Sequence, residues 1–342
     1  STTVLDAVRR VGALQAQSSS AVRLAIRART TGLTHADVAE ALGTARPVVR
    51  TSLMRGTLHL VPADDVRWMA ALLGPIVRAQ YQRRRVQLGL TDELCRAALD
   101  QLPALMAGED AVALGDIMDR LAQRGITIDR STQAPIHLML LACAEGVVCR
   151  GPDAGRSPAF MLTDAWVAPA AARSRDDALA ELARRYLAGR GPATVHDFRY
   201  WSGLGAADCT AAFDHIAPEL VHVVVVEQRL VALASDDLDP PTVPTVRLLG
   251  MWDEYLLSYR SRDALIATGH ANQIFVGGVI QAAVLVDGIV VGAWRIVGSG
   301  RTRRLCVEAF SPLSRDVRDA LDSEVTDLAR FLDVGLRLDL TN

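Results

Sequence analysis

The sequence predicts an α+β protein made of three tandem winged helix-turn-helix units, followed by a C-terminal β-rich region. The first observation is a repeat, because three segments share one pattern at spacings of 79 and 81 residues. Each of these segments contains an aspartate followed by an apolar residue: Asp37-Val38, Asp116-Ile117 and Asp197-Phe198. The second observation is a change in composition after residue 239, where valine and isoleucine become frequent and D-G and G-S-G turns indicate hairpins.

The repeated segments have the order of elements found in winged helices. A short amphipathic helix follows a Thr or carries an Asp in its first turn, and both residue types favour a helix N-terminus. A glycine turn, a second helix and an apolar strand pair follow. We therefore expect winged helices over residues 1–90, 91–170 and 171–238, and the β-rich region over residues 239–342.

The remaining elements are predicted from apolar spacing and from turn residues. We expect helices over 4–14, 21–33 and 176–191, loops over 151–158 and 235–244, and a closing helix from about Arg315 to Leu332.

The composition excludes several classes of protein. Half of the 342 residues are apolar, but no apolar stretch approaches the roughly 18 residues of a membrane helix. No basic-then-apolar leader opens the sequence, so we expect neither a membrane protein nor a secreted one. The five cysteines are scattered without a C-x-x-C pair, which favours reduced thiols over a zinc site. There is no Walker loop, G-x-G-x-x-G, G-x-S-x-G or H-E-x-x-H, so we expect no cofactor and no metal.

The basic residues are unusual in kind and in distribution. All of them are arginine, so no lysine amine is present for Schiff-base catalysis. The net charge is only −2, yet arginine strongly outnumbers acidic residues in 1–90 and the balance is reversed in the rest of the chain. This asymmetry predicts a polyanion partner on one face, although runs such as Arg83 to Arg85 could simply coat a solvated helix.

Two glutamines two residues apart are the first candidate site. Gln15 and Gln17 lie where the first helix runs out, and the following Ser18-Ser19-Ser20 suits the cap of the next helix. On a helix, residues two apart point about 200° from each other, whereas in an extended segment they share one face. We expect the helix to end near Leu14, with both amides projecting together and Ala16 packed behind them. The alternative is two ordinary surface glutamines.

A polar strip is predicted in the first wing. In a strand, alternation would place Arg55, Thr57 and His59 on one face, where they would contact a ligand or simply face solvent.

A hairpin with several arginines is predicted in the β-rich region, between Arg295 and Glu308. Arg295, Arg301, Arg303 and Arg304 lie near the turn at 298–300, where they suit contact with phosphate or a DNA groove. The alternative is an exposed edge strand protected by charge.

Asp253 is the fourth candidate. It lies between aromatic residues in the segment Trp252-Asp253-Glu254-Tyr255, where it could stabilise a cation or orient a water molecule, or could cap the following helix.

These motifs, in the order in which they occur along the chain, resemble those of the winged-helix DNA glycosylases of the AlkZ and YcaQ type. The matching stretches span most of the chain: ALQAQ (13–17), MRGTLHLVPADD (54–65), ARRYLAGRGPATVHDFRYWSGL (183–204), WDEYLLSYRSRD (252–263) and VLVDGIVVGAWR (284–295). The resemblance implies three winged helices that form a concave, positive surface for double-stranded DNA. It also implies hydrolysis of the N-glycosidic bond of N7-alkylated purines, including those in interstrand crosslinks, and a hairpin that enters the DNA cleft, placed here at 295–304.

The catalytic motif of that family is Gln-apolar-Gln in the AlkZ branch, and Gln15 and Gln17 match it. The resemblance therefore implies an enzyme like those that confer self-resistance to azinomycin, although the serines after the motif replace the Asp-Pro of many relatives. The N7-alkylguanine ring is cationic and leaves without protonation, so the two amides need only position water and stabilise positive charge, with Asp253 as an electrostatic helper. Because the chain has no lysine, we expect a monofunctional enzyme that leaves an abasic site. We also expect a cytoplasmic, nucleoid-associated monomer.

Three alternatives remain at this point. One is a non-catalytic winged-helix regulator, which would bind a specific sequence and release no base. Another is a repair enzyme with broad activity on small adducts such as N7-methylguanine. The third is an interaction scaffold with degenerate catalytic positions.

Overall fold

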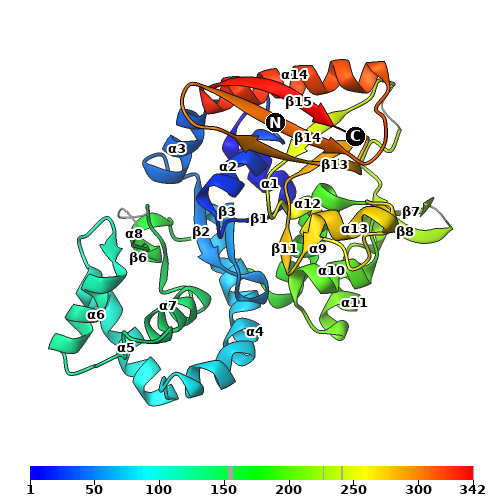
Figure 1. Ribbon diagram of the computed structural model, residues 1–342. Helices are drawn as coiled ribbons and strands as arrows, with labels where there is room; N and C mark the ends of the chain where they lie inside the picture. Colours follow the sequence, from blue (N-terminus) through cyan, green and yellow to red (C-terminus); the bar gives the residue numbers. More distant parts are fainter. Residues whose placement is uncertain (153–156, 226, 240–241, 342) are drawn as a thin grey trace. The chain divides into compact units, whose positions relative to one another are not determined.

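The computed structural model describes residues 1–152, 157–225, 227–239 and 242–341, which fold as two compact units. Unit 1 contains residues 1–39, 184–201 and 216–342, and unit 2 contains residues 40–183 and 202–215. The α+β class is confirmed, because each unit combines helices with a sheet (Figure 1). None of the helices in these ranges is both long and apolar enough to cross a membrane.

Unit 1 is built on a sheet with the strand order β15-β14-β13-β12-β9. Neighbouring strands are antiparallel except β14 and β15, which are parallel. Helix α14 lies along one face of this sheet (Figure 1), where Leu321, Val325 and Leu328 pack against Leu305 and Val307 of β14. The strands are β9 (Val246–Leu249), β12 (Ala283–Val286), β13 (Ile289–Val297), β14 (Thr302–Ala309) and β15 (Gly335–Thr341).

The other helices and strands of unit 1 include those that carry the candidate site described below. They are α1 (Val4–Val11), β1 (Leu14–Gln15), α2 (Ser19–Arg27), α3 (His35–Gly43), α9 (Arg175–Arg190), α10 (Val195–Ser202), β7 (Leu220–Val225), β8 (Gln228–Leu233), α12 (Glu254–Leu257), α13 (Ala271–Ile274), β10 (Phe275–Val276) and β11 (Val279–Ile280). Helices α3, α9 and α10 each cross a boundary between the units.

The predictions for the β-rich region are largely confirmed. The closing helix α14 runs from Arg315 to Leu332 as expected, and Ser314 caps it by accepting from the Val317 amide at 3.3 Å. The hairpin between β13 and β14 turns at 298–301, as the glycines indicate. Strand β15 was not predicted, and it makes β14 an internal strand of the sheet. The proposed alternative of an exposed edge strand is therefore wrong.

Unit 2 packs helices against the sheet strands β3-β2-β5-β6-β4. Its elements are β2 (Val48–Ser52), β3 (Leu58–Pro62), α4 (Val66–Gln87), α5 (Asp92–Met106), β4 (Val112–Ala113), α6 (Leu114–Gln123), α7 (Ala134–Ala144), β5 (Val148–Arg150), β6 (Ala159–Leu162), α8 (Thr163–Trp166) and α11 (Ala206–His215). Its core includes Leu102, Ile117, Leu138 and Met139, which come from three helices. All five cysteines of the chain are free, and four of them are buried.

The close packing of α4 on α7 makes Gly74 a sensitive position. A Cβ at Gly74 would lie 2.1 Å from the Ala144 carbonyl oxygen, so the helices would have to separate. We expect Gly74→Ala to destabilise the protein by about 1–3 kcal/mol, the usual cost of overpacking. The matched control is Gly115→Ala in α6, where a Cβ meets nothing within 4 Å and helix propensity favours alanine. Thermal or urea unfolding measures both; a Gly74→Ala protein as stable as Gly115→Ala would contradict this prediction.

The repeated segments are only partly as predicted. Two of the three begin with the same capping arrangement, in which Asp37 and Asp197 each accept from the backbone amide of the threonine three residues earlier and that hydroxyl accepts in return. In the second and third segments two helices precede the hairpin, α6–α7 and α10–α11. In the first, β2 follows α3 directly, so the expected second helix after residues 34–42 is absent there. The predicted boundaries at 90, 170 and 238 stay predictions.

The N-terminal helices are shorter than predicted. Helix α1 ends at Val11 instead of Leu14, because Gly12 adopts φ 78° and terminates it. Helix α2 ends at Arg27 instead of residue 33. Helix α9 agrees with its prediction within one residue at each end. The predicted loops over 151–158 and 235–244 lie partly outside the described residues.

Candidate functional site

Gln15 and Gln17 form a pair of amides on one side of an extended segment. Gln15 lies in β1, and its side-chain Nε2 donates to Gln17 Oε1 at 3.3 Å. Ala16 is fully buried between them, Gln15 is 8% exposed and Gln17 is exposed. The prediction that the two amides project together is confirmed. Each carbonyl oxygen has two lone pairs, so the pair keeps acceptor capacity for a water molecule.

A buried ion pair holds the backbone that carries this motif. Glu254, the first residue of α12, accepts from the Gln15 amide N–H with Oε2 at 2.8 Å. Its other oxygen lies 3.2 Å from Arg190 NH2 at the end of α9. Arg190 donates to the carbonyls of Val11 and Ala13, the latter at 3.0 Å. The chain is thus held on both sides of Leu14 by two side chains that are paired with each other.

An aromatic cluster surrounds that ion pair. Tyr186, Phe198 and Trp201 are fully buried, with ring centroids 5.2–6.2 Å apart. The Trp201 indole N–H donates to Glu254 Oε1 at 2.7 Å, and the Arg190 guanidinium lies 4.4 Å above the Trp201 ring. Burial lowers the pKa of Arg190, while the Glu254 carboxylate opposes that change. An arginine stays charged under these conditions, so the pair is ionic.

Asp253 has the capping role that was the alternative interpretation of its sequence. Its Oδ1 accepts from the Tyr255 amide at 2.9 Å and so caps α12. Arg29 binds both carboxylate oxygens, at 2.7 and 2.9 Å, and Asp253 is 1% exposed. Burial acts to lower the pKa of Arg29, but the facing Asp253 carboxylate outweighs it and the pKa is raised. Because Arg29 neutralises this carboxylate, the geometry gives no support to Asp253 as an electrostatic helper.

The strip predicted at Arg55, Thr57 and His59 is not a single strand. Met54–Gly56 is a 3-10 turn in which Arg55 has φ 55°, and β3 begins only at Leu58. The expectation of one alternating strand is therefore wrong, because the turn glycine and the Tyr81 hydroxyl, which donates to the Arg55 carbonyl, shape this segment.

The three side chains of this strip differ in accessibility. Arg55 and Thr57 are half-buried, and the Thr57 hydroxyl donates to the Met54 carbonyl at 3.0 Å. His59 is 1% exposed and donates through Nδ1 to the Thr57 carbonyl at 2.9 Å. Burial leaves His59 without a surface for direct contact, while DNA contact by Arg55 and Thr57 stays a prediction.

The hairpin arginines divide between the two faces of the unit 1 sheet. Arg295 is opposite Cys306 in the register, so Arg295 and Arg304 lie on the same face, away from α14. Both are exposed, and Arg304 makes a loose 3.5 Å ion pair with Asp339. Arg301 is exposed at the turn, and Arg303 donates to the Gly300 carbonyl at 3.0 Å. The structure therefore brings at least Arg295 and Arg304 together on one open surface, as DNA contact would require.

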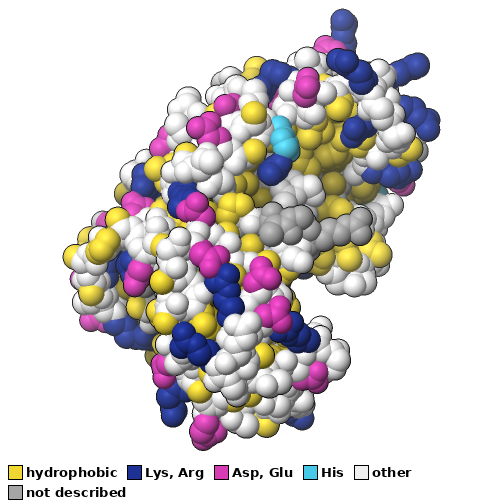
Figure 2. Space-filling model, turned by 90° about the vertical axis from the view of Figure 1, so that its left-hand side faces the viewer, with side chains coloured by type: hydrophobic (Ala, Val, Ile, Leu, Met, Phe, Trp, Pro, Cys, Tyr) yellow, Lys and Arg dark blue, Asp and Glu magenta, His cyan; other side chains and the backbone are white. Residues whose placement is uncertain are grey.

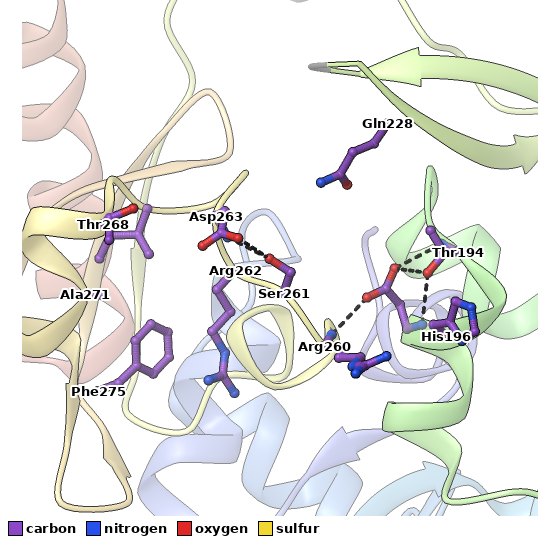
Figure 3. Close-up of a pocket in the computed structure, with 12 residues that line it drawn as sticks. Thr194, His196, Gln228, Arg260, Ser261, Arg262, Asp263, Thr268, Ala271 and Phe275 are labelled. Carbon is purple, nitrogen blue, oxygen red and sulfur yellow. Dashed lines mark hydrogen bonds between the residues drawn. The ribbon is translucent and has the colours of Figure 1, made fainter.

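A cavity of about 600 Å³ in unit 1 lies between the start of α10 and the segment 260–275 (Figure 3). Asp197 lines it and accepts from the Arg260 amide at 2.9 Å, which fastens this segment to α10. Arg262 stacks over Phe275 at 4.3 Å and donates to the Tyr200 hydroxyl at 3.3 Å. Helix α10 therefore contacts this cavity through Asp197 and the Glu254 carboxylate through Trp201.

The charge is mixed on the face that Figure 2 shows. In Figure 2, arginine and acidic side chains lie interspersed, and every dark-blue side chain is arginine because the sequence has no lysine. Contact with DNA on this face would therefore depend on local groups of arginine more than on net charge. Over the part of the chain that the structure describes, no group of three or more His, Cys, Asp or Glu side chains is placed to hold a metal ion.

Sequence reasoning missed Glu254 and Arg190. Glu254 stands next to Asp253, and only the direction of the backbone at the start of α12 decides which of the two acids points to the glutamines. Arg190 was one arginine among many. The available signal was the matching of 183–204 and 252–263 to a known family, since the two residues lie within these stretches.

Comparison with known proteins identifies one family model and a similar solved structure. The family model described as DNA glycosylase AlkZ-like matches residues 8–331. Among solved structures, the chain is similar to the Streptomyces sahachiroi DNA glycosylase AlkZ, with a TM-score of 0.80 and 22% identity. That alignment covers 99% of this chain and 94% of the other. No curated protein matches the sequence significantly.

Proposed function

The chain belongs to the AlkZ-like family of DNA glycosylases, and from that premise we propose that it hydrolyses the N-glycosidic bond of N7-alkylated purines. The substrates we propose include bulky adducts and interstrand crosslinks, as in self-resistance to a DNA-alkylating natural product. The observation that carries the proposal is the pair of coupled amides at Gln15 and Gln17, held on a buried scaffold.

The chemistry suits amides because the leaving group is already activated. An N7-alkylguanine carries a positive charge and departs as a neutral base, so no general acid is needed. The amide of a glutamine is no general base at neutral pH, but its carbonyl accepts a hydrogen bond from water. Gln15 and Gln17 hold the attacking water near C1′ and direct their carbonyl dipoles at the positive charge that develops on the sugar.

The product we propose is an abasic site in an uncut strand. Glycosylases that also cut the strand use an amine to form a Schiff base, and this chain contains no lysine. We further propose that the chain acts as a monomer on the nucleoid DNA of the cytoplasm. Three winged helices, with Arg55, Thr57 and the hairpin arginines, would provide the surface for double-stranded DNA.

The direct test is base release from a duplex with a single N7-alkylguanine. We expect free base to appear with the wild-type protein, and a strand break to appear only after the DNA is treated with alkali. A strand break before alkali would contradict the monofunctional mechanism. Running N7-methylguanine beside a bulky adduct measures the substrate range, and we expect the bulky adduct to react at least as fast.

The same assay separates catalysis from DNA binding alone. A chain that binds the duplex but releases base from neither adduct would contradict the proposal and would indicate a winged-helix regulator. Binding that depends on DNA sequence would support that second interpretation, because a lesion-directed enzyme contacts mainly the backbone and the damaged base.

A further inference from the structure

The Arg190–Glu254 pair is more fully bonded than a structural ion pair needs to be. The two carboxylate oxygens bind different partners, since Oε2 accepts from the Gln15 amide, whereas Oε1 accepts from Trp201 at 2.7 Å and faces Arg190 at 3.2 Å. The guanidinium nitrogens also divide their donors, with Nε bonded to Ser258 Oγ at 2.6 Å. Both side chains are at most 2% exposed.

We propose that Glu254 and Arg190 are positioning residues for base release. By holding the backbone, they set the direction in which the Gln15 side-chain amide points. The inference rests on the catalytic role proposed above for the glutamine pair. The ion pair binds the Ala13 carbonyl at 3.0 Å and the Gln15 N–H at 2.8 Å, the two groups that flank Leu14. Fixing both groups fixes the rotation of the extended segment, and with it the face from which Gln15 and Gln17 project.

Burying this ion pair costs desolvation free energy, which argues that the pair does more than stabilise the fold. The free-energy cost of removing two charges from water is offset only where every donor and acceptor is satisfied. Apolar residues of similar size often give the same stability. A fully bonded network has one low-energy arrangement and resists small rotations of the groups it holds. Such rigidity matters for a water-positioning pair, because a misplacement of about 1 Å can cost about 100-fold in rate.

The chain contains a matched control elsewhere in unit 1. Glu324 of α14 is 8% exposed, accepts from Arg27 at 2.7 Å and accepts from the backbone amide of Leu248 at 2.9 Å. It therefore has similar burial, the same kind of partner and the same kind of backbone contact as Glu254, but the backbone it holds belongs to β9 and not to the glutamine motif.

The experiment compares Glu254→Gln with Glu324→Gln. We expect both to lower the melting temperature, and Glu324→Gln by the smaller amount, because Arg27 keeps its ion pair with Asp327 at 2.8 Å. Only Glu254→Gln should slow single-turnover base release, by about 10- to 100-fold, with the affinity for the duplex unchanged within about twofold. A Glu254→Gln protein with the wild-type rate would overturn the proposal, and so would an equal loss in Glu324→Gln.

A second measurement is independent of catalysis. The Trp201 indole proton, identified by its absence in Trp201→Phe, should move upfield in Glu254→Gln, since the charged acceptor is lost. It should stay in place in Glu324→Gln. If the wild-type protein releases no base at all, the proposed function fails. The Trp201 resonance still decides whether Glu254 holds α10 and the motif. An unmoved signal in Glu254→Gln would overturn the positioning role.

Discussion

Replacing both Gln15 and Gln17 by alanine is expected to slow base release from an N7-alkylguanine duplex by about 10³-fold. The change removes the two side-chain carbonyls that we assign to the attacking water, and it removes little else. The backbone at Gln15 stays bonded to Glu254, and Ala16 between the glutamines stays buried. We therefore expect the melting temperature and the affinity for undamaged duplex to change little. Single-turnover release with saturating protein measures the chemical step directly.

The chain supplies a matched control for this variant. Gln80 and Gln82 are a second pair of glutamines two residues apart, with Tyr81 between them, but they are exposed on helix α4. We expect Gln80→Ala/Gln82→Ala to release base at the wild-type rate. Wild-type activity in the Gln15→Ala/Gln17→Ala protein, or an equal loss in the control, would contradict the role of the motif.

That second pair shows what the sequence could and could not decide at the glutamines. The pattern Gln-apolar-Gln occurs twice, so the pattern alone does not identify a site. The local context does, because Gly12 terminates a helix before Gln15, whereas Gln80 lies inside 22 continuous residues of helix. Residues two apart share a face only in the extended case. This is a short-range effect of backbone conformation, and sequence reasoning can therefore predict it.

Long-range contacts were beyond that reasoning. Glu254 meets Gln15 across 239 positions of sequence, and nothing in either local pattern indicates their contact. The adjacent Asp253 was the more conspicuous candidate, yet its two oxygens are used by Arg29 and by the cap of α12. The prediction of a continuous strand over residues 55–59 was wrong for a different reason. A glycine turn with positive φ interrupts the alternation of side chains that such a strand would have.

Removing two arginines of the β13–β14 hairpin is expected to weaken DNA binding by roughly 10- to 100-fold at about 0.15 M salt, if each contacts one phosphate. We would change Arg301 and Arg304 to glutamine. Both are exposed, and the only ion pair of Arg304 that the described residues show is the 3.5 Å contact with Asp339, which contributes little to stability. The slope of log K against log salt should fall in magnitude by about 1.8, that is, about 0.9 for each lost phosphate contact.

The control distinguishes a contact from a general effect of charge. Arg315→Gln/Arg318→Gln removes the same two charges from exposed positions of α14 in the same unit. If DNA responds only to net charge, both double variants should bind equally weakly and keep similar salt slopes. If the hairpin contacts the backbone, only the first variant should lose affinity and slope. Equal losses would therefore remove the hairpin from the DNA-binding surface, and the Arg295 face of the sheet with it, because Arg304 lies on that same face.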